Sequence, residues 1–240
     1  MSTYQTRLVG REPIALGTMA FHLDKPPGFA FKPGQAIDVV LLDAPAGDAQ
    51  SARHTFSIVS APFENELVVA TRLRDSAYKR ALGSLPVGAR VAIEGPFGSL
   101  GLHKDPARAA VLIAGGVGIT PFISMLRQAT HDRLAQQIVL VYSNRRPEDA
   151  AFLAELQQLQ QRSAQFRLIA TMTSMSRSTQ AWDGPTGQID EALVRQVASG
   201  VSRPIYYVVG PPAMAEAIRQ TLNDAGVDDD DIRSEEFYGY

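Results

Sequence analysis

The first 102 residues alternate short apolar-rich segments with turns. Extended segments are expected at 14–23, 35–42, 54–60, 66–73 and 90–94, separated by stretches rich in Pro, Gly and Asp. One helical segment, 76–85, interrupts the series and is followed by Pro86 and Gly88. Many short strands at this spacing are typical of a small antiparallel barrel. The pattern therefore predicts a β-barrel domain in this part of the chain.

The pattern changes after a polar stretch at 103–106. Continuous apolar runs now alternate with helical segments, with strands expected at 109–115, 137–143, 166–173 and 205–210 and helices at 121–129, 147–161 and 211–225. This alternation is typical of a parallel sheet covered on both faces. We therefore predict an antiparallel β-barrel domain at 1–104, followed by a Rossmann-like parallel α/β domain at 105–240.

Composition and charge exclude several classes of function. Of the 240 residues, 45% are hydrophobic and 20% charged, the balance of a globular protein. Lys and Arg number 23 against 25 Asp and Glu, so no net positive charge favours nucleic acid or an anionic membrane as a partner. The absence of Cys excludes disulfides, a thiol nucleophile and a Cys-held iron–sulfur cluster in this chain. No apolar run is long enough to span a bilayer, which predicts a cytoplasmic protein.

Metal and hydrolase sites are not expected either. His22, His103 and His131 lie far apart in the sequence and in no metal-ligand spacing. The sequence contains no GxSxG elbow, no Walker phosphate loop and no HExxH motif.

A glycine-rich turn, GGVGITP at 115–121, joins an apolar strand to a helix. Gly115, Gly116 and Gly118 there would let the backbone approach a diphosphate, and the helix N-terminus offers N–H groups and a positive dipole end. The alternative is that a tight strand-to-helix turn needs glycine for its own geometry. The turn is thus a candidate nucleotide site.

The next strand ends in polar and cationic residues. The turn has no acidic residue about 20 positions on that would bind a ribose 2′-hydroxyl. Asn144, Arg145 and Arg146 follow the strand instead, and Arg suits a 2′-phosphate by bidentate hydrogen bonding. Arg177, after the following strand, is a second candidate for the same phosphate. The alternative is a solvated strand end with no ligand.

Cationic residues also gather in the predicted barrel. RHTFSIVS at 53–60 combines an aromatic ring, hydroxyls and cations, and a second strand ends in Arg72 and Arg74. The helix after it opens with Ser76 and carries Lys79 and Arg80 in its first turns. Cations at a helix N-terminus are unfavourable by about 0.3–1 kcal/mol unless an anion is near. These residues indicate a bound phosphate or, alternatively, a solvated cationic face.

The motifs together resemble those of the ferredoxin–NADP reductase family, flavin-dependent NAD(P)H oxidoreductases. The matching segments, in the order of the family, are FKPGQ at 31–35, RHTFS at 53–57, EGPFG at 94–98, GGVGITP at 115–121, VGPP at 209–212 and EEFYGY at 235–240. Each is weakly specific alone, and the shared order is strongly specific. The resemblance covers nearly the whole chain.

The resemblance implies that the barrel binds FAD and that the α/β domain binds NADPH or NADH. It implies that Phe56 lies against the isoalloxazine ring and that Ser57 hydrogen-bonds near flavin N5. The remaining residues implied to contact the flavin nucleotide are Arg53, His54, Thr55, Thr71, Arg72, Ser76, Tyr78, Lys79 and Arg80.

On the nucleotide side, the resemblance implies that Gly115, Gly116 and Gly118 approach the diphosphate and that Thr120 contacts the nicotinamide ribose. Gly210 and Pro211 would border the nicotinamide. Phe237 or Tyr240 would shield the other flavin face until the nicotinamide displaces the ring.

The sequence departs from the family pattern at three positions, which affects the assignment of these residue roles. Strand alternation places His54, two residues before Phe56, on the face of that ring, so either His54 replaces the family's flavin-phosphate arginine or a bulge turns Arg53 toward it. Val209 stands where the family has a cysteine near the nicotinamide, and Lys79 stands at a position where the family has Ser or Thr.

The sequence predicts a reductase that passes electrons from NAD(P)H through FAD to a separate carrier protein such as ferredoxin, flavodoxin or an oxygenase component. The cations Arg72, Arg74, Lys79 and Arg80 would steer an acidic carrier. The alternatives are a flavin or ferric-chelate reductase with a small diffusing acceptor, and a non-catalytic relay subunit of a larger complex. A monomer is the simplest expectation.

Overall fold

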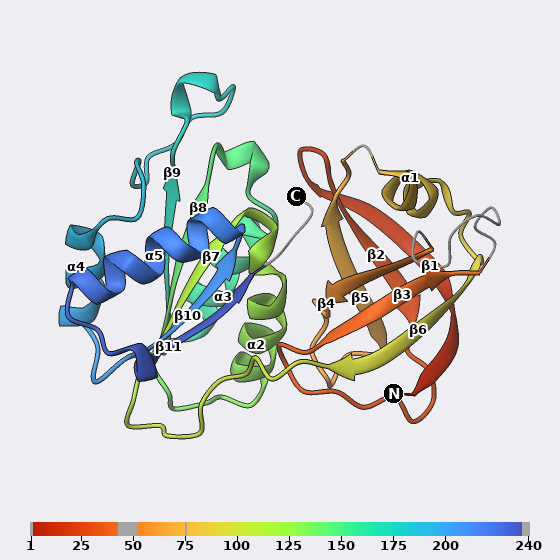
Figure 1. Cartoon of the computed structure of the whole chain (residues 1–240), viewed down its shortest axis with the longest axis horizontal. Coiled ribbons are helices and arrows are strands. Elements are labelled where there is room, and N and C mark those ends of the chain that lie inside the picture. The colour runs from red at the N-terminus through yellow and green to blue at the C-terminus, as the bar shows by residue number, and fades with distance from the viewer. Residues whose placement is uncertain (1, 43–51, 75, 237–240) are drawn as a thin grey trace. The chain divides into compact units, whose positions relative to one another are not determined.

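The computed structural model describes residues 2–42, 52–74 and 76–236 (Figure 1). The chain forms two compact units. We call Met1–Gly101 with Thr120–Gln128 the barrel unit, and Leu102–Ile119 with Ala129–Tyr240 the sheet unit. The predicted fold class, an antiparallel β domain followed by a parallel α/β domain, is confirmed.

The barrel unit is one six-stranded sheet in the order β4-β3-β6-β1-β2-β5, in which every named pairing is antiparallel. Its elements are β1 (Thr3–Ala15), β2 (Thr18–Asp24), β3 (Ala36–Leu41), β4 (Arg53–Ser57), β5 (Glu66–Arg72), α1 (Ala77–Ser84) and β6 (Arg90–Phe97). Alternate apolar side chains such as Phe21, Ile37 and Ile93 are completely buried and form its core. Tyr78 and Leu82 bring the apolar face of α1 into the same core.

The sheet unit is a five-stranded parallel sheet in the order β11-β10-β7-β8-β9. Its strands are β7 (Ala110–Gly115), β8 (Ile138–Asn144), β9 (Phe166–Met172), β10 (Ile205–Gly210) and β11 (Ile232–Glu236). The helices are η1 (Gly116–Ile119), α2 (Thr120–His131), η2 (Pro147–Asp149), α3 (Leu153–Arg162), η3 (Met175–Arg177), α4 (Glu191–Ser199), α5 (Pro212–Asp224) and η4 (Asp229–Asp231). All residues of β7 and β10 are buried, which explains their continuous apolar sequence.

The helix α2 is divided between the two units. Its first nine residues, Thr120–Gln128, cluster with the barrel unit. There the Ser124 hydroxyl donates to the Ser60 carbonyl oxygen at 2.7 Å, and Arg127 pairs with Glu64 at 3.2 Å. These contacts lie within the barrel unit, to which the first nine residues of α2 belong.

Several elements differ from the sequence expectation. The predicted strand 14–23 is the end of β1, a turn at Gly17 with φ of 66°, and β2. The predicted helix 147–161 is divided into η2 and α3, because Phe152 adopts a left-handed conformation with φ of 60°. Three elements were missed: most of β1, α4 and β11.

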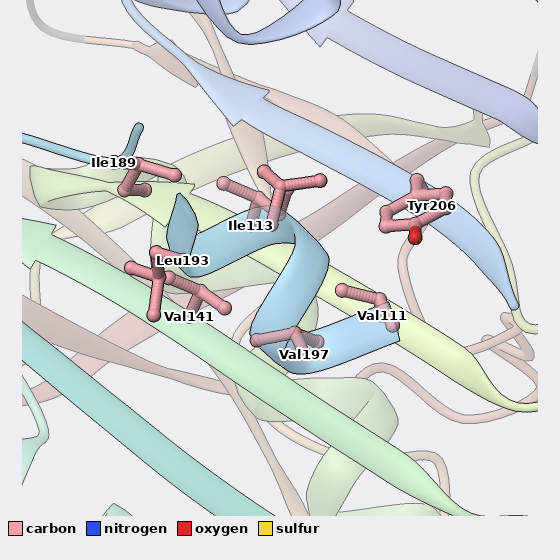
Figure 2. A pocket seen from close by; sticks show the side chains of 8 residues that line it. Val111, Ile113, Val141, Ile189, Leu193, Val197 and Tyr206 are labelled. Atoms are coloured by element: carbon pink, nitrogen blue, oxygen red, sulfur yellow. The ribbon is translucent and has the colours of Figure 1, made fainter. Parts of the chain in front are cut away.

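A small apolar pocket with a cavity volume of about 10 Å³ lies in the core of the sheet unit. Figure 2 shows that side chains of β7, β8 and β10 meet those of α4 around it. The residues that line it are Val111, Ile113, Val141, Ile189, Leu193, Val194, Val197 and Tyr206. With only apolar groups around it, the pocket offers a water molecule no hydrogen bonds and is expected to be a packing defect.

Candidate functional site

The barrel unit has an open seam between its two edge strands. β4 and β5 end the sheet, and among the described residues they pair at one isolated bridge, between Ile58 and Val69. The backbone N–H of Val59 adds one hydrogen bond of 2.8 Å to Val68 beside that bridge. Beyond it β4 (Arg53–Ser57) and the end of β5 run without a shared ladder, so their facing backbone edges are left for other partners. We call this opening the seam.

The two faces of β4 carry different side chains. Its pairing with β3 is regular, with Ile37 opposite Phe56 and Val39 opposite His54. Phe56 and His54 therefore share one face, and their rings lie 4.8 Å apart in an edge-to-face arrangement. Arg53 and Thr55 lie on the opposite face.

Acidic residues of neighbouring strands occupy that opposite face. Arg53 donates to the Glu94 carboxylate at 2.6 Å and lies 3.6 Å from that of Asp38. The Thr55 hydroxyl also donates to Asp38. These contacts tie β4 to β3 and β6.

The helix α1 brings hydroxyl, aromatic and cationic groups to the end of the seam. Ser76 caps the helix by accepting the backbone N–H of Lys79 at 3.2 Å, and no acidic residue lies in the first turn. The Tyr78 ring lies 5.4 Å from that of His54 and its hydroxyl donates to the Val39 carbonyl oxygen at 2.8 Å. Burial raises the pKa of Tyr78, so this phenol stays protonated.

Burial and a neighbouring cation disfavour the charged form of two basic groups near the seam, His54 and Lys79. Burial lowers the pKa of His54, the Lys79 ammonium lowers it further, and the Asp38 carboxylate acts in the opposite direction. Burial and the Arg74 guanidinium lower the pKa of Lys79, which is only 5% exposed. Burying cations close together is unfavourable, and a bound anion between them would reduce this cost.

The expected flavin-side residues are brought together along this seam and α1. Phe56, Ser57, Thr71, Tyr78 and Lys79 are buried, His54 and Arg72 are half-buried, and Arg53, Thr55, Ser76 and Arg80 are exposed. Thr71 and Arg72 end β5. An aromatic ring and two hydroxyl-bearing residues, all buried, therefore lie along the seam with cationic residues of β5 and α1.

The sheet unit has a topological switch point between β7 and β10. The chain continues from β7 toward β8 on one side, whereas β10 and β11 lie on the other side. In open α/β sheets ligands bind outside the carboxyl ends of strands at such a point. Gly115, Gly116 and Gly118 follow β7 there, and Gly210 and Pro211 follow β10, so the expected nucleotide residues meet at this edge.

The glycines of this turn have different reasons for lacking a side chain. A Cβ on Gly115 would meet the Met214 side chain, and one on Gly118 would lie 2.8 Å from the Val209 carbonyl carbon. Packing therefore requires glycine at 118, where the obstacle is backbone, whereas at Gly115 the obstacle is the flexible end of a methionine side chain. Gly116 has φ of 54° and open space where a Cβ would stand.

A buried tyrosine holds the turn from behind. The Tyr142 hydroxyl lies 3.1 Å from the carbonyl oxygens of both Gly116 and Ala151. Tyr142 is completely buried, and burial raises its pKa. The single hydroxyl proton is thus shared between the loops that follow β7 and β8, a role that the sequence gave no signal to find.

The candidate residues for a 2′-phosphate lie on two linked loops. Arg146 forms a bidentate ion pair with Asp149, with both distances 2.8 Å, and donates to the Arg177 carbonyl oxygen at 3.3 Å. Asn144 is buried, whereas Arg145 and Arg177 are exposed and their side chains make no ion pair with any described residue. Arg146 is therefore structural, and it holds the loops that carry the two other arginines.

One carboxyl group at this edge was missed. Glu235 pairs with Val209 across β11 and β10, and its buried Oε2 has no hydrogen-bond partner among the described residues. Burial raises its pKa. Its position in EEFYGY was the available signal. Phe237 and Tyr240, expected to shield the flavin, lie outside the described residues.

Comparison with known proteins shows which proteins this chain is similar to. The sequence profile of the Oxidoreductase NAD-binding domain matches residues 112–220. The glycine betaine monooxygenase reductase subunit of Chromohalobacter salexigens is 30% identical over 223 residues, which is 92% of this chain and 60% of that protein. Ferredoxin–NADP reductase B of Sorangium cellulosum is 28% identical over 228 residues, 90% of each chain. Over most of its length the chain is therefore similar to ferredoxin–NADP reductases and to reductase subunits of oxygenases.

The fold of this chain is shared with solved structures. A Neisseria gonorrhoeae ferredoxin NADP+ reductase with bound FAD and NADP matches with a TM-score of 0.79 and 21% identity over 98% of both chains. The chain spans 60% of the length of the Chromohalobacter relative, so that protein contains sequence with no counterpart here. Among the described residues no helix is long and apolar enough to cross a membrane, and no cluster of acidic or histidine side chains could hold a metal ion.

Proposed function

We propose that the chain is an FAD-dependent NAD(P)H oxidoreductase that passes electrons to a separate carrier protein. FAD binds in the seam of the barrel unit, within residues 1–104, and NADPH or NADH binds at the switch point, within residues 105–240. The observation that carries the proposal is the seam, where two edge strands of the barrel part beside an aromatic ring, hydroxyls and cations.

The seam residues fit FAD by their chemistry. A flavin ring is flat and has polar atoms along one edge, and the facing backbone edges of β4 and β5 offer N–H and C=O groups to such an edge. Phe56 supplies an apolar surface, and Ser57 and Thr71 supply hydroxyls. Cationic groups at α1 suit the diphosphate.

When bound, FAD supplies the redox chemistry, accepting a hydride from the nicotinamide and releasing electrons singly or in pairs. The chain orients the flavin and the nicotinamide relative to each other and shields them from water. By family resemblance Ser57 hydrogen-bonds near N5, Thr120 contacts the nicotinamide ribose, Gly210 and Pro211 border the nicotinamide, and Phe237 or Tyr240 covers the ring. Val209 has no thiol to offer the nicotinamide, so at this residue the chain would contribute only to the positioning of the ring.

The acceptor is proposed to be a ferredoxin, a flavodoxin or an oxygenase component. A relative is the reductase subunit of a glycine betaine monooxygenase, which supports an oxygenase partner. Arg72, Arg74, Lys79 and Arg80 surround α1 and the end of β5, and they would steer an acidic carrier. We propose a cytoplasmic monomer.

The test is a visible spectrum followed by anaerobic mixing with NADPH or NADH in a stopped-flow cell. We expect flavin absorption bands that bleach rapidly with one of the two nucleotides. Rapid reduction of free flavins or ferric chelates without a carrier would favour the small-acceptor alternative. A bound flavin that neither nucleotide reduces would favour the relay subunit, and a chain that takes up no added FAD would overturn the proposal.

We propose NADPH as the preferred donor, because Arg145 and Arg177 are exposed on loops that Arg146 ties together. Arg145→Ala and Arg177→Ala should raise KM for NADPH about tenfold and leave KM for NADH nearly unchanged, since a lost charge-assisted hydrogen bond contributes about 1.5–3 kcal/mol. Equal effects on both nucleotides would contradict the assignment.

A further inference from the structure

We propose that His54 and Lys79, and not Arg53, bind the flavin diphosphate, so that this chain holds FAD more tightly at acidic than at alkaline pH. The inference rests on the proposed function and concerns how this chain departs from an arginine-based site. It follows from the pairing of β4, from the partners of Arg53 and from the charges around His54.

The strand pairing decides which side chain faces the seam. All five residues of β4 pair in regular register with β3, from Ser57 opposite Ala36 to Arg53 opposite Val40. No extra residue is accommodated, so there is no bulge that would turn Arg53 to the face of Phe56. His54 holds that place, with its ring 4.8 Å from Phe56 and 5.4 Å from Tyr78.

Arg53 already has carboxylate partners on the other face of the strand. Its Nη2 lies 2.6 Å from Glu94 Oε1 and its Nη1 lies 3.6 Å from Asp38 Oδ2. To reach a ligand on the Phe56 face, the side chain would leave both carboxylates and pass the edge of its own strand. Its role is to fasten β4 to β3 and β6.

The groups around His54 favour the neutral ring until an anion arrives. Lys79 and Tyr78 approach from α1, and Asp38 acts from β3. Burial and Lys79 lower the pKa of His54 below its ordinary value of 6.5, and the Asp38 carboxylate only partly opposes them. A diphosphate beside the imidazole reverses the balance, because an opposite charge at hydrogen-bond distance raises the pKa of a histidine. FAD binding therefore takes up a proton, and its affinity rises as the pH falls.

The test compares FAD with riboflavin on the full chain stripped of flavin. Riboflavin carries the same ring without phosphate, so it reports any general effect of pH on the seam. From pH 8 to pH 5.5 we expect the dissociation constant of FAD, measured by flavin fluorescence, to fall about tenfold, the equivalent of one pKa unit of coupling. That of riboflavin should stay constant. Calorimetry in two buffers of different ionisation enthalpy should show proton uptake with FAD only.

Three variants separate the candidates. His54→Arg should bind FAD with an affinity independent of pH, because an arginine keeps its charge. His54→Gln should bind FAD about tenfold more weakly at pH 5.5 and lose the pH dependence. Arg53→Gln should retain the pH dependence, although removal of its ion pairs lowers stability.

The outcomes distinguish this inference from the proposed function. If neither FAD nor riboflavin binds, the proposed function fails. If FAD binds equally at both pH values, or if Arg53→Gln and not His54→Gln weakens it, the assignment to His54 is overturned while the reductase proposal stands.

Discussion

The seam of the barrel unit and the glycine turn of the sheet unit use their motif residues in opposite ways. At the seam, β4 and β5 share no ladder beyond one bridge, and the motif residues there are side chains of differing chemistry. At the turn, Gly118 stands where the Val209 backbone leaves no room for a methyl group, and Gly115 lies against the flexible Met214 side chain. The first motif specifies chemistry, whereas most of the second specifies close packing.

This difference explains why the family pattern is altered at one site and kept at the other. The replacement of an arginine by His54 that we propose would change the charge available at the seam, and the strand pairing there is regular. A comparable change at Gly118 would have to move the backbone of β10. Substitutions should therefore separate function from stability in the barrel unit and combine them in the sheet unit.

The largest expected effect is at the turn. Gly118→Ala should lower the free energy of unfolding by about 3 kcal/mol, because the new methyl would overlap the Val209 backbone, which cannot swing aside as a side chain can. Gly116→Ala is the matched control, with open space and only a left-handed backbone to oppose it, at about 1 kcal/mol. Thermal unfolding followed by circular dichroism measures both, and equal losses would remove the packing explanation.

At the seam we expect the reverse. Ser57→Ala should change the free energy of unfolding by less than about 1 kcal/mol, because its hydroxyl makes no hydrogen bond with the described residues. It should slow anaerobic flavin reduction about tenfold through loss of the contact near N5, equivalent to about 1.4 kcal/mol.

Ser60→Ala is the opposite control for Ser57→Ala. Ser60 is completely buried and its hydroxyl accepts the Val68 N–H at 3.0 Å. Its loss should cost about 1–3 kcal/mol of stability and leave the reduction rate unchanged. If Ser57→Ala destabilises as much as Ser60→Ala, Ser57 is a structural residue.

Tyr142→Phe sharpens the comparison at the turn, because it changes the support of Gly116 without adding an atom. Loss of the hydrogen bonds to Gly116 and Ala151 should weaken binding of the oxidised nucleotide about fivefold, equivalent to about 1 kcal/mol, with flavin content unchanged. Tyr206→Phe removes a buried hydroxyl that makes no hydrogen bond with the described residues. Difference spectroscopy with NADP+ compares the two, and equal weakening would exclude a specific role for Tyr142.

The smallest expected effect concerns packing away from both sites. Val197→Ile should fill part of the pocket under α4 and raise the free energy of unfolding by about 0.5 kcal/mol. Val91→Ile adds the same methylene to the core of the barrel unit, where Val91 is completely buried, and should destabilise. Denaturant midpoints that move in the same direction would show that the pocket has no energetic effect.

The sequence predicted best what depends on local alternation. Continuous apolar runs identified β7, β8 and β10, and alternation placed His54 on the face of Phe56, as the ring distance confirms. The strands β1 and β11 escaped because they bury few side chains. In β1 only Thr6 and Leu8 are buried, and in β11 none of the residues is fully buried.

The site details that the sequence could not give depend on contacts between distant segments. Tyr142 reads as an ordinary strand residue, and its hydroxyl contacts are set by how the loops after β7 and β8 close over it. The left-handed conformation of Phe152, which divides a predicted helix, is likewise imposed by tertiary structure. The ion pair of Arg146 with Asp149, three residues apart, was readable from spacing and was overlooked.

The seam also affects the solubility of the folded protein before FAD binds. Two strand edges that share no ladder among the described residues are templates for pairing with another chain, the first step of aggregation. A ligand that binds only the folded state also stabilises it in proportion to the logarithm of its concentration. The cellular supply of flavin would then determine how much of this chain accumulates as folded protein. Expression under riboflavin limitation would yield inclusion bodies, and not soluble protein of reduced activity.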